Sequence, residues 1–109
     1  MKTIEISSEY SVTSQITVED VQTISHLGFR AIMCNRPDNE EPGQPRAQDI
    51  GAEAERLGLK FSWVPVETGR IQPQNILDFS SELQRLPKPV LTYCRTAARC
   101  THLFDMAGL

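Results

Sequence analysis

Strand-like and helix-like segments alternate along the whole of this 109-residue chain, and the alternation limits the folds open to it. Short apolar runs rich in β-branched residues are followed by stretches with apolar residues at helical spacing, and glycine or proline separates them. Consecutive strands joined through helices lie parallel, with the connecting helices on the faces of the sheet. The pattern predicts an α/β fold: a mainly parallel sheet of four to five strands with helices on both faces.

The apolar periodicity also predicts where the elements lie. Thr17 and Asp20 have the spacing of a helix-capping pair, and Ile16 and Val21 stand where a hydrophobic staple would place them. Gly28 is expected to end that first helix. The full expectation is strands over 4–6, 10–12, 29–34, 59–66 and 89–93, and helices over 17–28, 46–57, 76–86 and 97–106.

Composition narrows the class of protein. Hydrophobic residues make up 39% of the chain, charged residues 23%, and the net charge is −3, so no basic excess suggests nucleic acid or an anionic membrane. A chain of this length predicts one domain over residues 1–109. No apolar run approaches the roughly 20 residues that span a bilayer, and no secretory signal is recognisable. The three cysteines lack disulfide spacing, which favours a reducing, cytoplasmic location.

The segment from Tyr93 to Arg99 carries the strongest functional signal. It leads from an apolar strand through a short loop into a helix, and Cys94 opens the loop. The backbone N–H groups of Thr96, Ala97 and Ala98, together with the start of the helix, can converge on one anion. Arg99 adds a forked cation. Such a field favours the Cys94 thiolate, so Cys94 is predicted to be a nucleophile and Arg99 its anion-binding partner.

Two further polar loops should reach the same edge of the sheet, because ligands of such sheets bind at the carboxyl ends of the strands. Asp38 is the first candidate for a general acid, and Glu67 is the second. Arg36 is a candidate second anion contact, although its segment could simply be a turn with locally satisfied polar groups. Arg95 is expected to be a solvated charge at the rim of the site, with contact to the bound anion as the alternative. Glu40 and Glu41 (40–41) are expected to be a solvated charge pair.

The other cysteines carry weaker signals. Cys34 ends a predicted strand and is expected to be a core residue. Cys100 falls just past the loop, where plain helix packing is the main expectation and resolution of an oxidised Cys94 is the alternative. Their spacing with His102 matches no zinc pattern, so neither a metal nor a cofactor is expected.

These motifs together resemble the bacterial phosphatase-like domain family of beta-lactamase-hydrolase-like proteins, over nearly the full chain. The resemblance implies a three-layer fold like that of the tyrosine and dual-specificity phosphatases, with the nucleophilic cysteine in a phosphate-binding loop. The chain departs from the family's Cys-Arg-Ser-Gly pattern, because Thr96 and Ala97 stand in place of serine and glycine. The segments that carry the resemblance are Ser14–Thr17, Asn35–Asp38, Glu41–Pro45, Val64–Val66 and Tyr93–Arg99.

The resemblance leaves two enzyme classes and one non-enzyme class open. A phosphatase would hydrolyse a phosphate ester through a phosphocysteine on Cys94. Four residues separate Cys94 from Arg99, a spacing closer to rhodanese-type sulfurtransferases, which would carry a persulfide there. A weakly active module that binds anions or a partner is the third possibility, because Ala97 would strain the loop. In each enzyme case the partner is a small anionic molecule, a phosphate ester or a sulfane sulfur donor.

Overall fold

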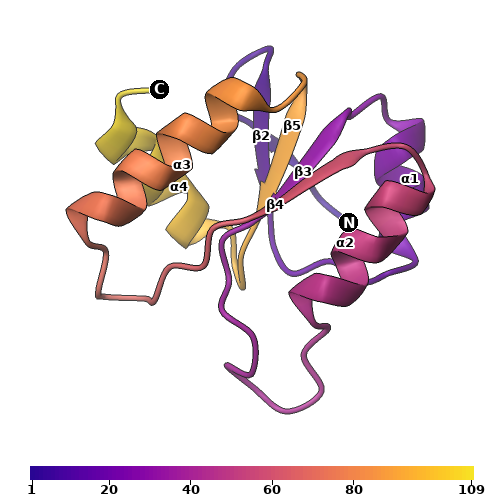
Figure 1. Cartoon of the computed structure of the whole chain (residues 1–109), viewed down its shortest axis with the longest axis horizontal. Helices are drawn as coiled ribbons and strands as arrows, with labels where there is room; N and C mark the ends of the chain where they lie inside the picture. The colour runs from indigo at the N-terminus through magenta and orange to yellow at the C-terminus, as the bar shows by residue number, and fades with distance from the viewer.

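A computed structural model describes all 109 residues, which form one five-stranded sheet and four helices. The sheet lies between two pairs of helices (Figure 1). The strands lie in the order β1-β2-β5-β3-β4, and only β1 runs antiparallel to its neighbour. The strands are β1 (Ile4–Glu5), β2 (Tyr10–Thr13), β3 (Ala31–Cys34), β4 (Lys60–Trp63) and β5 (Val90–Tyr93). The helices are α1 (Asp20–His26), α2 (Ala47–Arg56), α3 (Pro73–Arg85) and α4 (Ala98–Ala107).

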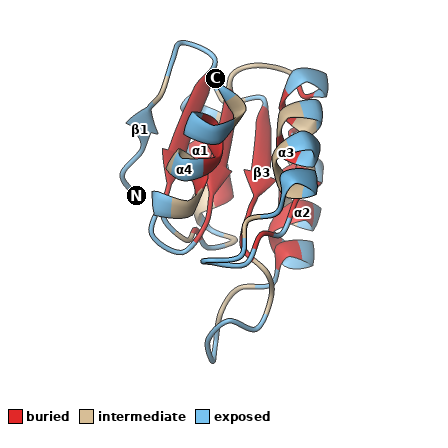
Figure 2. Ribbon diagram, turned by 90° about the vertical axis from the view of Figure 1, so that its left-hand side faces the viewer, coloured by how far each residue is buried: buried red, intermediate tan, exposed pale blue.

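Each face of the sheet packs against one pair of helices, which confirms the predicted α/β architecture. Every residue of β5 is buried, and its side chains alternate between the two faces. Val90 joins the hydrophobic cluster that contains residues of α3 and α4, whereas Leu91 and Tyr93 join the cluster on the side of α1 and α2. Figure 2 shows the same layering, with buried central strands and exposed outer helix surfaces.

The register of the parallel strands brings their carboxyl ends into one row. Thr13 lies beside Tyr93, Tyr93 beside Cys34, and Cys34 beside Trp63. The loops that follow β2, β5, β3 and β4 therefore begin at one edge. Backbone hydrogen bonds continue past that row, including one from the Asn35 N–H to the Tyr93 carbonyl oxygen at 2.9 Å. The fold thereby fixes the first residues of each loop.

Six of the nine predicted elements are shorter in the structure than the apolar pattern indicates. The largest difference among the strands is at the one predicted over 59–66: β4 ends at Trp63, although the Val64 and Val66 N–H groups still donate to the Cys34 and Asn35 carbonyl oxygens at 2.9 and 3.1 Å. The first helix begins at Asp20, although the predicted capping pair is present. The Thr17 N–H donates to Asp20 Oδ2 at 2.9 Å, and the Asp20 N–H donates to Thr17 Oγ1 at 3.2 Å.

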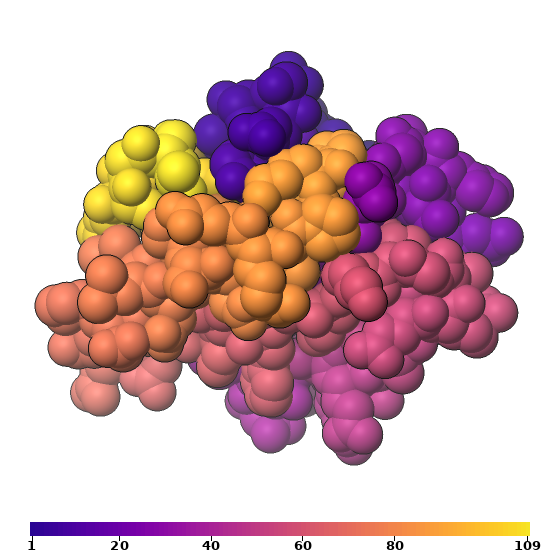
Figure 3. All heavy atoms as spheres, turned by 45° about the horizontal axis from the view of Figure 1, so that its top comes forward, coloured from indigo at the N-terminus to yellow at the C-terminus, as the bar shows by residue number.

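The two ends of the sheet differ in what covers them. Figure 3 brings forward the end at which the central strands begin, where the N-terminal residues lie beside the turn from α3 into β5. At the opposite end, the loop between β3 and α2 extends beyond the strands (Figure 1). None of the four helices combines the length and the apolar character needed to cross a membrane.

Candidate functional site

Cys94 is the first residue after the central strand β5 and lies at the carboxyl edge of the sheet. Strands β2 and β3 hold β5 on both sides, so the position of Cys94 is set by the most buried part of the fold. The residue is only 1% exposed, yet its side chain lines an open pocket with a volume of about 620 Å³. A short loop joins it to α4, which begins at Ala98.

The loop turns several hydrogen-bond donors toward the Cys94 sulfur. The largest contribution comes from the neighbouring Cys100 thiol, and the backbone N–H groups of Cys100, Thr96 and Arg99 add to it. Burial opposes these donors, but together they outweigh it and lower the pKa of Cys94 to about 5. Of the three loop N–H groups expected from the sequence, those of Thr96, Ala97 and Ala98, only that of Thr96 is among these donors; the other two N–H donors belong to the first turn of α4.

Cys100 supports Cys94 from the core. The Cys100 side chain is fully buried, as the packing expectation requires, and burial raises the pKa of its thiol. Cys100 Sγ donates to Asn35 Oδ1 at 3.4 Å, and the same thiol lies near enough to Cys94 to lower the pKa of Cys94. Asn35 is itself held by a hydrogen bond from its Nδ2 to the Val64 carbonyl oxygen at 3.1 Å. Asn35 and Cys100 thus link the residue after β3 to the surroundings of Cys94.

Ala97 adopts the left-handed conformation that the family pattern assigns to glycine. Its φ is 75° and its ψ is −18°, and it is the residue immediately before α4. For an L-residue with a β-carbon this conformation costs roughly 1–2 kcal/mol. The expected strain is present, but the loop N–H groups still reach Cys94. Ala97 therefore adds backbone strain to the loop, but the N–H groups near Cys94 keep their positions.

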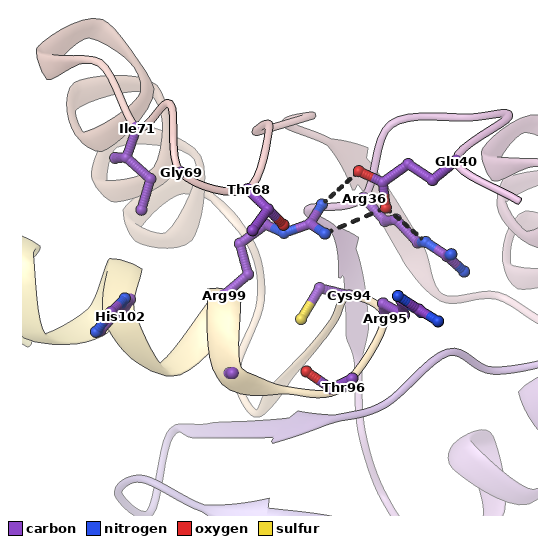
Figure 4. A pocket seen from close by; sticks show the side chains of 11 residues that line it. Arg36, Glu40, Thr68, Gly69, Ile71, Cys94, Arg95, Thr96, Arg99 and His102 are labelled. Carbon is purple, nitrogen blue, oxygen red and sulfur yellow. Dashed lines mark hydrogen bonds and ion pairs between the residues drawn. The ribbon is translucent and has the colours of Figure 1, made fainter.

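Arg99 lies above the pocket and forms a fork with a carboxylate from the β3–α2 loop. Its Nη1 and Nη2 each lie 3.1 Å from an oxygen of Glu40, and Nη1 also donates to the Val66 carbonyl oxygen at 2.9 Å. The Arg99 side chain is 8% exposed, and its Nε is buried without a partner. Figure 4 shows the fork with Glu40, which leaves Nε as the one guanidinium nitrogen without an acceptor.

Glu40 was expected to be solvated, and that expectation is wrong. Its side chain is 24% exposed and contacts two guanidinium groups, because Arg36 Nε also donates to its Oε1 at 2.8 Å. Burial alone would raise the pKa of Glu40, but hydrogen bonds and charge from Arg36 and Arg99 lower it overall. Glu41 is likewise paired, at 3.1 Å from Arg36. The sequence could not show these pairings, which depend on the folded loop.

Arg36 is enclosed rather than free for a ligand. It is 1% exposed, and beyond its two carboxylate contacts its Nη1 donates to Gln15 Oε1 at 3.0 Å. Burial opposes its charge, but the bonds and charges of Glu40 and Glu41 outweigh burial and raise the pKa of Arg36. The prediction of Arg36 as a second anion contact is therefore corrected: its donors are already used to hold the loop carboxylates, although it borders the pocket.

The structure also removes both predicted acids from the site. Asp38 Oδ1 accepts a hydrogen bond from the Ala47 N–H at 2.9 Å, so Asp38 caps the start of α2. The Asp38 carboxylate also lies near Cys34: burial raises the pKa of Cys34 to about 11, and the negative charge of Asp38 adds to that rise. Cys34 belongs to the cluster on the α1 and α2 side, away from Cys94. Glu67 is 66% exposed and pairs with Arg70 at 3.9 Å. Neither carboxylate lines the pocket.

The rest of the pocket wall comes from three segments. Arg95 is at the rim as expected, with a 63% exposed side chain 3.8 Å from Glu41. Thr96 and Ala98 line the pocket, whereas Ala97 does not. His102 follows Ala98 by four residues on α4, so helical spacing could have placed it on the same wall. Thr68 and Gly69 belong to the polar turn after Glu67 that was expected at this edge, whereas the sequence did not indicate Glu40, Ile71 or His102 as site residues.

Comparison with known proteins places the chain among phosphatase-like domains. A family profile described as "Beta-lactamase hydrolase-like protein, phosphatase-like domain" matches residues 3–108. The chain is 29% identical over 104 residues to a beta-lactamase hydrolase-like protein of Agrobacterium fabrum, covering 95% of this chain and 24% of that protein. A Xylella fastidiosa protein of the same description is 29% identical over 107 residues, covering 98% of the chain and 25% of the relative. The chain therefore spans about a quarter of these relatives.

Solved structures support the same fold. A proposed phosphatase from Neisseria meningitidis has a TM-score of 0.85 and 34% identity, covering 93% of this chain and 72% of that one. A proposed phosphatase from Shewanella putrefaciens has a TM-score of 0.86 at 14% identity, with 98% and 67% coverage. The active form of the protein named Tk-PTP has a TM-score of 0.67 at 16% identity, with 98% and 75% coverage. The last two show the fold alone.

Proposed function

The chain belongs to the phosphatase-like domain family of beta-lactamase hydrolase-like proteins, and we propose that it hydrolyses phosphate esters through a phosphocysteine on Cys94. The arrangement of the Cys94 loop carries the proposal. Three backbone N–H groups and the Cys100 thiol hold a thiolate there, and the unpartnered Nε of Arg99 is buried in the wall of the same pocket. A buried donor without an acceptor is costly, and an oxygen of a bound phosphoryl group would satisfy it.

The reaction that fits this geometry has two steps. The Cys94 thiolate attacks phosphorus, an S–P bond forms, and the bond from phosphorus to the ester oxygen breaks. The loop N–H groups and Arg99 Nε stabilise the charge on the non-bridging oxygens. Water then attacks phosphorus, the S–P bond breaks, and inorganic phosphate leaves while the thiolate returns. Cys94 must remain reduced, which suits a cytoplasmic protein whose three cysteines are all free.

The short loop favours a second candidate, sulfur transfer. Only four residues lie between Cys94 and Arg99, and no predicted carboxylic acid reaches the pocket. Sulfur transfer requires no acid. The Cys94 thiolate would take the outer sulfur of thiosulfate as a persulfide, sulfite would leave, and cyanide would remove that sulfur as thiocyanate. Both candidate substrates are small anions, and the open pocket admits either.

One paired assay distinguishes the candidates. Purified protein is given an aryl phosphate, and separately thiosulfate with cyanide, beside Cys94→Ser and the matched control Cys34→Ser. Cys34 is also buried, but its Sγ faces the Arg36 carbonyl oxygen at 3.3 Å instead of the pocket. We expect phosphate release that Cys94→Ser abolishes and Cys34→Ser retains.

Other results would overturn the proposal in distinct ways. Thiocyanate production that depends on Cys94, without phosphate release, would establish sulfur transfer instead. If neither assay detects activity but phosphate still protects Cys94 from alkylation, the result would indicate an anion-binding module instead of an enzyme. Activity that survives in Cys94→Ser would exclude every mechanism based on this thiolate.

A further inference from the structure

The pocket has a nucleophile and an anion cradle, but its only carboxylate is a poor proton donor. Glu40 is the one acidic residue that lines it, and that carboxylate is held by Arg36 and Arg99 in its ionised form. Asp38 caps α2 and Glu67 faces solvent, so neither can replace it. An ester with a poor leaving group still needs a proton on the departing oxygen. The donor should therefore be sought elsewhere on the pocket wall.

His102 is in a suitable position to be this proton donor. It lies on α4, three residues after Arg99 and four after Ala98, so one helical turn carries it along the wall of the pocket. Figure 4 shows the Cys94 sulfur with the Arg99–Glu40 pair on one side and His102 on the α4 side. The His102 side chain is exposed, which places it toward the mouth of the pocket rather than at its base.

The direction of the reaction also points to the mouth. In an in-line displacement at phosphorus, the leaving oxygen is opposite the attacking sulfur. Cys94 is buried, so the leaving oxygen faces the open side of the pocket, and the exposed residues that line the pocket include Thr68, Arg95 and His102. Among the side chains that line the pocket, imidazole is the type that most often serves as a general acid or base.

We propose that His102 is the general acid that protonates the leaving oxygen, a role that rests on the phosphatase function proposed above. As the S–P bond forms and the P–O bond breaks, the imidazolium gives its proton to the ester oxygen and becomes neutral. In the second step the neutral imidazole takes a proton from the attacking water, and the imidazolium is restored. The protein would then accept esters of poor leaving groups as well as activated aryl esters.

The test compares two substrates that differ only in their leaving group. p-Nitrophenyl phosphate releases a stabilised phenolate that needs little protonation, whereas phenyl phosphate releases a basic one. For His102→Gln we expect kcat/KM to fall by roughly 10²–10⁴ with phenyl phosphate and by less than about tenfold with p-nitrophenyl phosphate. His26→Gln is the matched control, because His26 is an exposed histidine at the end of α1 on the other face of the sheet, and it should change neither value. Thermal unfolding of each variant checks that the fold is retained.

The possible failures separate the role of His102 from the proposed function. If His102→Gln changes neither substrate, or slows both by the same factor, His102 is not the acid, although activity lost in Cys94→Ser would still support phosphate hydrolysis. If the unmodified protein releases phosphate from neither ester, the function and the role of His102 both fail. A change in His26→Gln equal to that in His102→Gln would also overturn the assignment.

Discussion

Replacing Glu40 by glutamine should destabilise the protein, because it removes the carboxylate that two enclosed arginines share. The Glu40 carboxylate makes three contacts of 2.8–3.1 Å with Arg36 and Arg99, whose side chains are 1% and 8% exposed. Glu40→Gln keeps the size of the side chain and one acceptor oxygen, but removes the charge between two enclosed guanidinium groups. Removing one partner of a buried ion pair costs about 3–5 kcal/mol, because the remaining charge is uncompensated.

The expected loss is smaller than that range for two structural reasons. Glu40 is about a quarter exposed, so solvent screens part of the interaction. Arg36 also keeps Glu41, at 3.1 Å, as a counter-ion. We therefore expect the free energy of unfolding to fall by about 2–3 kcal/mol, and the Tm by roughly 10 °C. Urea and thermal unfolding of the wild type and Glu40→Gln at neutral pH measure both quantities.

Glu53→Gln is the control, because it removes an ion pair with hydrogen bonds as short as those of Glu40 but with an exposed arginine. Glu53 contacts Arg56 through equally short hydrogen bonds of 2.8 and 2.6 Å, and at 20% its exposure is close to that of Glu40, but its partner Arg56 is 67% exposed. No resolvable change in stability is expected there. Equal losses in Glu40→Gln and Glu53→Gln, or no loss in Glu40→Gln, would refute the argument that enclosure of the two guanidinium groups determines the cost.

The same pair gives a defined pH dependence. The folded protein holds the pKa of Glu40 below its ordinary value of 4.5, so ionised Glu40 stabilises the native state above that pH. This contribution is lost as the pH falls through the lowered pKa. The difference in stability between the wild type and Glu40→Gln should therefore be largest near neutral pH and shrink in acid. A difference that grew in acid would contradict the assignment.

Three further predictions concern the loop and its surroundings. Cys100→Ala removes the largest stabiliser of the Cys94 thiolate and should raise the pKa of Cys94 by about one to two units, seen as a shift in the pH profile of alkylation; an unchanged profile would exclude the contact. Asp38→Ala should lower stability by about 1 kcal/mol while phosphatase activity is retained, and Asp38→Asn should keep the cap; activity lost in both would restore Asp38 as the acid. Ala97→Gly relieves a strained φ, but it removes a buried methyl group and increases the entropy of the unfolded chain. The free energy of unfolding should therefore change by less than about 1 kcal/mol. A larger gain in stability would mean that the strain at Ala97 is underestimated.

Features that depend on neighbouring residues were predictable from the sequence. The order of strands and helices follows from apolar periodicity, and the reciprocal Thr17–Asp20 hydrogen bonds follow from their spacing. The Cys94 loop was also recognisable, because strand, nucleophile and helix start are contiguous in the chain. Even the strain at Ala97 could be expected from the residue type at that position.

Features that depend on contacts distant in sequence were not predictable in the same way. Glu40 and Arg99 are 59 residues apart, and only the fold brings their side chains together. A polar loop residue such as Asp38 can serve equally as a helix cap or as an acid, and its partner on α2 decides between them. Arg36 is charged, yet the β3–α2 loop encloses it almost completely, against the usual preference of arginine for the surface.

The most direct test of this account is a pH titration of the thiolate absorbance of Cys94, taken as the difference between the wild type and Cys94→Ser. The central claim is that the loop N–H groups and Cys100 hold Cys94 ionised at neutral pH. The difference signal should rise with a midpoint near pH 5, while Cys34, with a pKa of about 11, stays protonated in this range. A midpoint near the ordinary value of 9 would show that the loop does not activate Cys94, and would contradict both enzyme functions considered for it.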